Sequence, residues 1–182
     1  MGAALMSGLE DAPYAELHLH TCYSLLEGAS SPKELIARAA SHGYDALAIT
    51  DRNNLYGAMV FARACRDAGI RSIIGVELTV AVDPDDDPDA GPDDVPPGSR
   101  HDLTLLAETR QGYANLCRLV SLANGWGLAE QADRERRRRD PCAALHHVRE
   151  HTAGVVCLTG GRHGELAQRV AAGDRPGARD VL

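Results

Sequence analysis

The stretch AELHLHTCYSLLEG, residues 15–28, carries the strongest structural signal in the chain. In an extended strand, alternate side chains point to the same side, so Glu16, His18 and His20 project one way. Leu17 and Leu19 then project the other way. Imidazoles that converge at the end of a strand are suitable ligands for Zn, Mn or Fe. The pair alone is a weak signal, because two half-buried histidines can equally bond to neighbouring polar groups.

Short β-rich runs alternate with helical runs along the chain, which predicts an α/β fold with parallel strands. Ser31, Pro32 and Glu34 form the pattern of a capped helix N-terminus, and Gly43 is expected to end that helix. We expect strands at 14–20, 45–50, 71–80, 103–107 and 154–159, and further helices at 55–68, 113–123, 142–151 and 166–172.

Two carboxylates occupy equivalent places in successive strand units. Asp51 follows Gly43 by eight residues, and Glu77 follows Gly69 by eight residues, each at the end of a predicted strand. The carboxyl ends of parallel strands lie at one face of a sheet, where active sites are built. We therefore expect Asp51 and Glu77 to meet there. The unit that begins at Gly154 reaches only glycine at the equivalent position, which offers no ligand atom.

The composition excludes several classes of protein. With 182 residues, 44% of them hydrophobic, the chain can form one domain of ordinary size. The net charge of −7 disfavours sequence-independent DNA binding, which depends on a basic surface. The five cysteines form no CxxC pair, and the sequence has neither an apolar run long enough for a bilayer nor a secretory signal. We therefore expect a cytoplasmic protein with no membrane partner.

The domain is expected to occupy residues 14–182, after a flexible N-terminal segment at 1–13. An acidic loop rich in Pro and Asp is expected at 83–100, because this composition does not suit a packed element. Its seven aspartates equal in number the net negative charge of the chain. The acidity therefore belongs to the loop and says little about the rest of the surface.

The quoted stretch, together with AITD at 48–51 and IGVE at 74–77, resembles the PHP (polymerase and histidinol phosphatase) domain of bacterial C-family DNA polymerase α subunits. The likeness covers about residues 14–161 and is strongest to the error-prone branch. It implies a distorted (β/α)7 barrel of parallel strands with surrounding helices. The barrel would be incomplete here, because the family's last Asp-x-His motif lies beyond Leu182. In relatives with an intact site, the barrel centre holds up to three metal ions and hydrolyses phosphoesters.

By position, the resemblance implies metal ligands for a divalent ion such as Zn, Mn or Mg: His18, His20, Glu27, Glu77 and His101. It also marks three residues that alter or support the site: Asp51, Arg52 and Gly161. Arg52 replaces a family histidine and cannot ligate a metal, but its cation could pair with Asp51 or Glu77. Gly161 stands where polymerase relatives have a cysteine. At most one weakly bound ion, or none, is expected, and no catalytic residue is assigned.

Three functions remain open. The first is the N-terminal PHP domain of an error-prone DNA polymerase α subunit, which serves replication and translesion repair synthesis as part of the full chain. Its metal site would be degenerate and structural, and its partners would be the remainder of the polymerase and, through it, DNA. The second is a metal-dependent phosphoesterase or 3′→5′ exonuclease. The third is a non-catalytic interaction scaffold.

Overall fold

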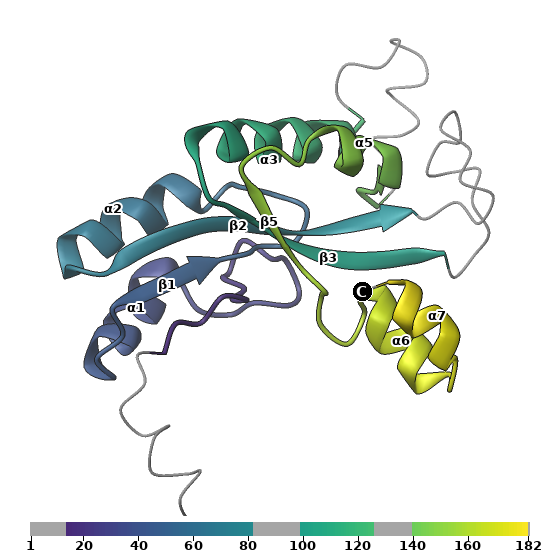
Figure 1. The fold of residues 1–182 in the computed structure, drawn as a ribbon. Helices are drawn as coiled ribbons and strands as arrows, with labels where there is room; N and C mark the ends of the chain where they lie inside the picture. The colour runs from purple at the N-terminus through teal and green to yellow at the C-terminus, as the bar shows by residue number, and fades with distance from the viewer. Residues whose placement is uncertain (1–13, 82–98, 126–139, 182) are drawn as a thin grey trace, which may run out of the picture.

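The computed structural model describes residues 14–81, 99–125 and 140–181, and Figure 1 shows how their helices and strands are arranged. The predicted flexible segment at 1–13 and nearly all of the predicted acidic loop at 83–100 lie outside the described residues. Within the described ranges, no helix is long and apolar enough to cross a membrane.

A five-stranded sheet forms the centre of the fold. Its strands are β1 (Ala46–Ile49), β2 (Arg71–Ala81), β3 (Arg100–Ala107), β4 (Ala143–Ala144) and β5 (Val155–Leu158). The order is β1-β2-β3-β5, and β4 also pairs with β2. Six helices accompany the sheet among the described residues: α1 (Pro32–Ser41), α2 (Ala58–Ala68), α3 (Arg110–Ala123), α5 (Leu145–Glu150), α6 (Glu165–Ala171) and α7 (Arg175–Asp180). The predicted α/β class, with helices around a sheet that contains parallel strands, is therefore confirmed.

The expectation that all strands run parallel is wrong. β2 is parallel to β1 and β4, but β3 is antiparallel to both β2 and β5. Parallel neighbours need a crossover connection, usually a helix, whereas antiparallel neighbours do not. The sequence between β2 and β3 is rich in Asp and Pro and carries no helical pattern. The antiparallel pairing of these two strands is consistent with that composition.

The predicted first strand at 14–20 does not form a regular strand, although it lies beside β1. Glu16 makes a single parallel bridge to Leu47, and its carbonyl accepts from Ala48 N–H at 2.9 Å. Leu19 N–H donates to the Thr50 hydroxyl at 2.8 Å, and the Leu19 carbonyl accepts from Thr50 N–H at 2.9 Å. The segment therefore lies extended beside β1, with too few ladder bonds to count as a strand.

The predicted helix start at Ser31 is confirmed in detail. The Ser31 hydroxyl accepts from Glu34 N–H, and the Glu34 carboxylate accepts from Ser31 N–H at 2.8 Å, which completes a capping box. Gly43, just past the end of α1, has a φ of +74°. Elsewhere the predicted helices differ by a few residues at their ends, and α7 was not predicted.

Two apolar clusters form the core. One lies between the sheet and α3, where Val76, Leu78 and Val80 of β2 meet Leu116 and Leu119. The other joins α1, α2 and β1 through residues that include Ile36, Leu47, Ile49, Phe61 and Cys65. Side chains alternate along a strand, so the burial of Val76, Leu78 and Val80 against α3 turns Glu77 and Thr79 to the opposite face. That face carries the polar groups described below.

We expect Cys65 to be chemically inert in the folded protein. Its side chain is 0% exposed, and burial raises the pKa of its thiol to about 11, so the reactive thiolate is scarce at pH 8. Alkylation by iodoacetamide, followed by peptide-resolved mass spectrometry, should be slower at Cys65 than at exposed Cys22 by on the order of a hundredfold. In urea the two rates should converge. Similar rates in the native protein would contradict the packing of α2 against β1.

Candidate metal centre

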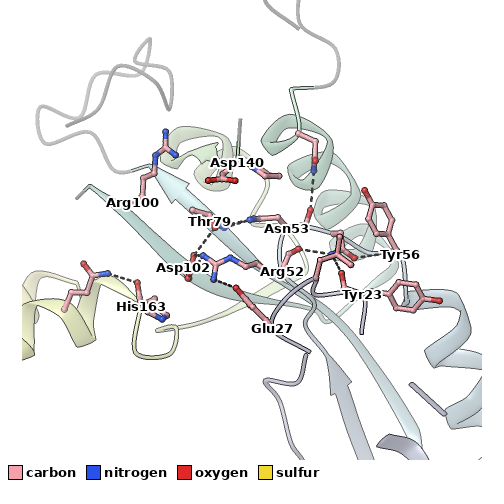
Figure 2. A pocket seen from close by; sticks show the side chains of 15 residues that line it. Tyr23, Glu27, Arg52, Asn53, Tyr56, Thr79, Arg100, Asp102, Asp140 and His163 are labelled. Carbon is pink, nitrogen blue, oxygen red and sulfur yellow. Dashed lines mark hydrogen bonds and ion pairs between the residues drawn. The ribbon is translucent and has the colours of Figure 1, made fainter. Parts of the chain in front are cut away.

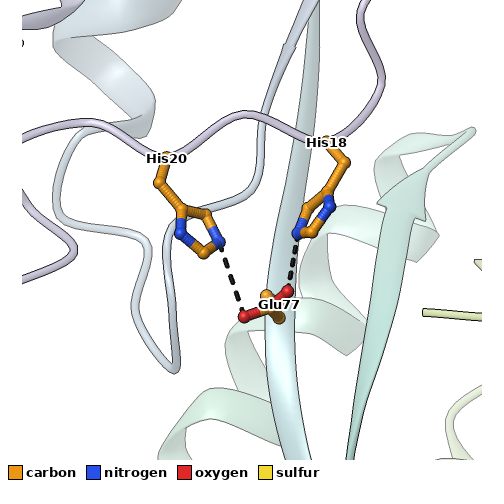
Figure 3. A group of neighbouring side chains, drawn as sticks. All are labelled: His18, His20 and Glu77. Carbon is orange, nitrogen blue, oxygen red and sulfur yellow. Dashed lines mark hydrogen bonds and ion pairs between the residues drawn. The ribbon is translucent and has the colours of Figure 1, made fainter. Parts of the chain in front are cut away.

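His18, His20 and Glu77 converge on one small volume (Figure 3). His18 Nε2 lies 2.6 Å from Glu77 Oε2, and His20 Nε2 lies 3.5 Å from Glu77 Oε1. One ligand atom from each residue lies within 4.8 Å of the others. The extended backbone beside β1 supplies both histidines, and the central part of β2 supplies the carboxylate. The predicted convergence of the histidine pair with Glu77 is therefore observed.

The chemistry of this group fits a divalent ion. Two neutral imidazoles and one carboxylate are a usual ligand set for Zn or Mn, which leaves further positions open. Glu77 is only 6% exposed, so its charge is removed from bulk water. His20 Nε2 is also buried and makes no hydrogen bond within the described part of the chain. A buried ring nitrogen without a bond is what an ion at this place would satisfy.

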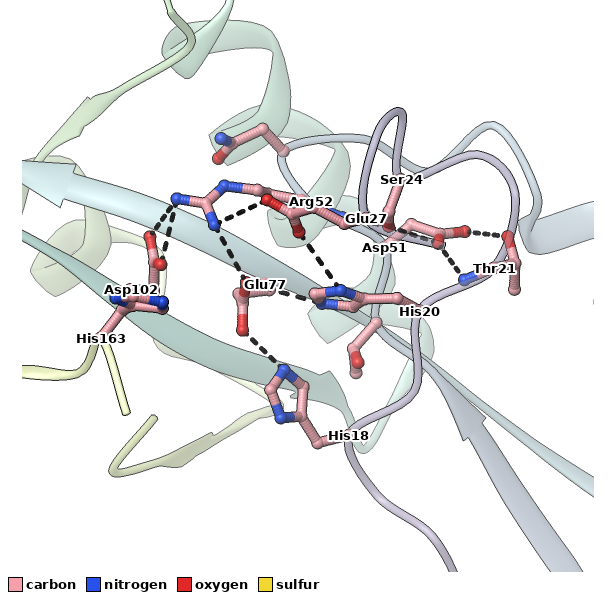
Figure 4. A network of polar contacts seen from close by, with 12 residues as sticks. His18, His20, Thr21, Ser24, Glu27, Asp51, Arg52, Glu77, Asp102 and His163 are labelled. Atoms are coloured by element: carbon pink, nitrogen blue, oxygen red, sulfur yellow. Dashed lines mark hydrogen bonds and ion pairs between the residues drawn. The ribbon is translucent and has the colours of Figure 1, made fainter. Parts of the chain in front are cut away.

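Arg52 places a permanent cation beside this group, as Figure 4 shows. Its guanidinium lies 3.1 Å from Glu27 Oε1, 3.7 Å from Glu77 Oε1 and 3.1 Å from Asp102 Oδ2. The predicted pairing with Glu77 is thus observed, and the alternative pairing with Asp51 is not. Arginine has donors but no lone pair for a metal, so the guanidinium offsets part of the negative charge of these carboxylates without acting as a ligand.

Glu27 borders the three-residue group without completing it. Its Oε2 lies 3.3 Å from His20 Nδ1, on the far side of the ring from Glu77, and its Oε1 is paired with Arg52. One carboxylate therefore contacts both a histidine and the guanidinium. Its role as a metal ligand stays a prediction.

Asp51 has a different role from Glu77, although their main chains meet as expected, with Glu77 N–H donating to the Asp51 carbonyl at 3.2 Å. The Asp51 side chain is buried. Its Oδ1 accepts from Thr21 N–H and from the Ser24 hydroxyl, both at 2.7 Å, and its Oδ2 accepts from the Thr21 hydroxyl at 2.8 Å. Asp51 therefore holds the loop that follows the two histidines against the end of β1.

The structure does not bring His101 to the group. His101 lies opposite Val80 in the β2–β3 pairing, and Val80 faces the α3 core. Side chains that pair across strands share a face, so His101 points away from Glu77. Its Nδ1 is buried and makes no hydrogen bond within the described ranges. A ligand role for His101 would require this strand register to differ.

Asp102 is a member of this polar site that the sequence analysis missed. It is only 3% exposed, pairs with Arg52 and accepts from the Thr79 hydroxyl at 2.9 Å. It lies opposite Thr79 in the strand pairing and so shares the face of Glu77. The two-residue period of β3 could have placed Asp102 on one face of that strand. To know that this is the face of Glu77 also requires the antiparallel register with β2.

Gly161 borders the site, as expected of a position that alters it. A Cβ added at Gly161 would lie 3.5 Å from His18 Cε1 and 3.9 Å from His18 Nδ1. A side chain at this position would therefore contact the His18 ring. Glycine leaves the space beside the ring without a ligand atom.

A cavity of about 700 Å³ opens beside Arg52 (Figure 2). Its wall mixes aromatic, basic and acidic side chains, among them Tyr23, Tyr56, Arg100, Asp102 and His163. This volume lies within the usual range for small-molecule sites. We call Arg52 and its partners Glu27, Glu77 and Asp102 the Arg52 network, and three of its members (Glu27, Arg52 and Asp102) line the cavity.

The Asp51→Asn variant should lose about 2 kcal/mol of unfolding free energy, because an amide nitrogen would face groups that now donate to the carboxylate. Urea denaturation followed by circular dichroism measures this loss. Asp67→Asn is the matched control, since the Asp67 side chain is 66% exposed and pairs only loosely with Arg66. Equal stability of the two variants would show that the Asp51 bonds do not hold the loop.

Comparison with known proteins places these residues in a family. A family model described as PHP domain matches residues 16–182. The error-prone DNA polymerase of Anaeromyxobacter sp. (strain K) is 40% identical over 161 residues, which cover 86% of this chain and 13% of that protein. DNA polymerase III subunit alpha of Chlamydia muridarum is 34% identical over 168 residues, which cover 91% of this chain and 12% of that protein. The chain therefore spans only about an eighth of the length of these curated relatives.

Among solved structures, an amidohydrolase from Chromobacterium violaceum aligns with 93% of this chain and 54% of its own. The TM-score is 0.39 and the sequence identity is 21%.

Proposed function

The chain belongs to the PHP domain family, and we propose that it is the PHP domain of an error-prone bacterial DNA polymerase α subunit. The 40% identity to an error-prone polymerase over 86% of the chain supports this assignment. In the whole protein the domain would serve DNA replication and translesion repair synthesis, with the rest of the polymerase as its direct partner and DNA as an indirect one. A cytoplasmic location is part of the same proposal.

Within that protein we assign the polar site a structural role, and the single observation that carries this assignment is the position of Arg52. Hydrolysis by two metals needs two ions close together, which stabilise the attacking and leaving oxygens. Here a guanidinium lies among Glu27, Glu77 and Asp102, where its charge would repel a second ion. Its own contacts join the loop at Glu27 to β2 and β3.

One divalent ion, Zn, Mn or Mg, could still be held by His18, His20 and Glu77. When bound, such an ion would polarise a phosphoryl oxygen or a water molecule. Glu77 orients both rings, since each of its oxygens faces one of them. This three-residue group and the adjoining cavity support the alternative function, a metal-dependent phosphoesterase or 3′→5′ exonuclease.

The polymerase assignment predicts that the two histidines are dispensable for DNA synthesis. In the full-length polymerase, the double variant His18→Ala, His20→Ala should extend a primer within about twofold of the parent rate, because the polymerase chemistry lies elsewhere. The parent should release no phosphate from a phosphomonoester and no nucleotide from a 3′ DNA end with Mn²⁺ present. Hydrolysis that the double variant abolishes would favour the phosphoesterase instead. A reading frame that encodes no polymerase after residue 182 would overturn the assignment.

Replacement of Arg52 should strengthen metal binding. Arg52→His removes the positive charge, frees three carboxylates and adds an imidazole, so the Kd for Mn²⁺ or Zn²⁺ should fall at least about tenfold, equivalent to about 1.4 kcal/mol. Isothermal titration of both forms measures this change.

The control for this titration is Arg63→His on α2, which places the same side chain on an exposed surface away from the site. Adding His18→Ala and His20→Ala to the Arg52 variant should remove the gain. Equal metal affinity in the parent and the Arg52 variant would show that Arg52 does not weaken metal binding at this site.

A further inference from the structure

Exposed apolar side chains gather on one part of the surface. Five of the eight large hydrophobic residues that are exposed among the described residues lie in the loop after the histidines or around the start of α2. We call this group the apolar patch: Leu25, Leu26, Tyr56, Met59 and Val60. Leu25 is 81% exposed, Leu26 106% and Met59 72%. Apolar groups of this kind on a surface mark sites of interaction.

The two parts of the apolar patch are held together. Asn54 Nδ2 donates to the Tyr23 carbonyl at 3.1 Å, which ties the loop to the turn before α2. Leu25 and Tyr56 line the same cavity. Met59 and Val60 line a second hollow on α2, which Lys33 and Arg63 border. The apolar patch therefore extends from the loop onto the helix, with charged residues of both signs, Lys33, Arg63 and Asp67, at its far edge.

Leu26 is held in an unfavourable backbone conformation. Its φ is +68°, in the left-handed region that a bulky side chain rarely adopts. Nothing among the described residues covers its side chain, which is fully exposed. Strain of this kind persists only where the surrounding structure imposes it, and it is concentrated at functional positions.

The surrounding structure does impose this conformation. On one side of Leu26, the Ser24 hydroxyl is bonded to Asp51, and on the other side Glu27 is paired with Arg52. Gly28 N–H also donates to the Ser24 carbonyl at 2.9 Å, which closes the loop. The polar site therefore presents Leu25 and Leu26 outward on a loop anchored at both ends.

We propose that the apolar patch is the surface on which the polymerase body docks, by which we mean the part of the polymerase outside this domain. This inference rests on the proposed function. It is supported by the length of the curated relatives, in which the region matched by this chain accounts for only 12–13% of the protein. Domains of one chain are held at a high effective concentration, so even a modest apolar surface is enough for one domain to dock on another. The Arg52 network then has a role without metal: it orients the docking loop.

Cysteine labelling in the full-length polymerase tests the proposal. Leu26→Cys should react with a maleimide at least about tenfold more slowly in the native protein than in urea, because the polymerase body covers it. The matched control is Val170→Cys on α6, a position that is 63% exposed and lies outside the apolar patch. Its native rate should stay within about threefold of its rate in urea.

A second variant, Leu26→Gly, should shift the thermal midpoint in opposite directions for a free loop and for a docked loop. Leu26→Gly relieves the positive φ, so it would raise the thermal midpoint of the full-length polymerase if the loop were free. If the loop is docked, the loss of the leucine contact should lower that midpoint by a few degrees. Leu26→Ala, which removes the same leucine contact but keeps a Cβ at the positive φ, serves as the control for the backbone effect.

Three outcomes would overturn the docking proposal while leaving the polymerase assignment intact. Fast native labelling at position 26 in an active polymerase would show that the polymerase body does not cover the apolar patch. Protection that disappears on dilution would assign the apolar patch to a second copy of the protein. A raised midpoint for Leu26→Gly would show a free loop. Failure of the full-length protein to extend a primer would instead count against the proposed function.

Discussion

The ion pairs of the Arg52 guanidinium are the interactions on which the polar site depends. Glu77 and Asp102 are almost fully buried, and a buried carboxylate is costly unless a positive charge lies close to it. Arg52 reaches both of them and Glu27 as well, so one side chain joins β2, β3 and the loop after the histidines. Arg52 is the member whose loss costs most, because Glu77 and Asp102 would then be buried without a guanidinium beside them.

Asp51 and Arg52 are neighbours in sequence but act on the same loop from two ends. Asp51 binds its beginning through Thr21 and Ser24, and Arg52 binds its end through Glu27. The residues between these anchors, Leu25 and Leu26, are the most exposed large hydrophobic residues among the described residues. A site with the appearance of a depleted metal centre thus also serves as a rigid support for a surface loop.

The sequence predicted the His18–His20–Glu77 group well, because both steps behind it are local. Alternation in an extended segment places the two rings on one side, and the end of a β-rich run marks the carboxylate. The capping box at Ser31 and the turn at Gly43 were equally accessible, since each depends on a few consecutive residues. Distant partners were less accessible: Asp102 was missed, and the strands were taken as parallel.

Residue type and short-range spacing alone therefore determined the family resemblance, the ligand chemistry, the helix starts and the absence of a ligand atom at Gly161. Only the tertiary structure decided which carboxylates Arg52 contacts, which face of β3 carries the polar side chain, and that Leu26 is held outward with a positive φ. The physical reason is register. The direction and alignment of paired strands depend on contacts across the whole sheet, and a shift of one residue exchanges the two faces of a strand.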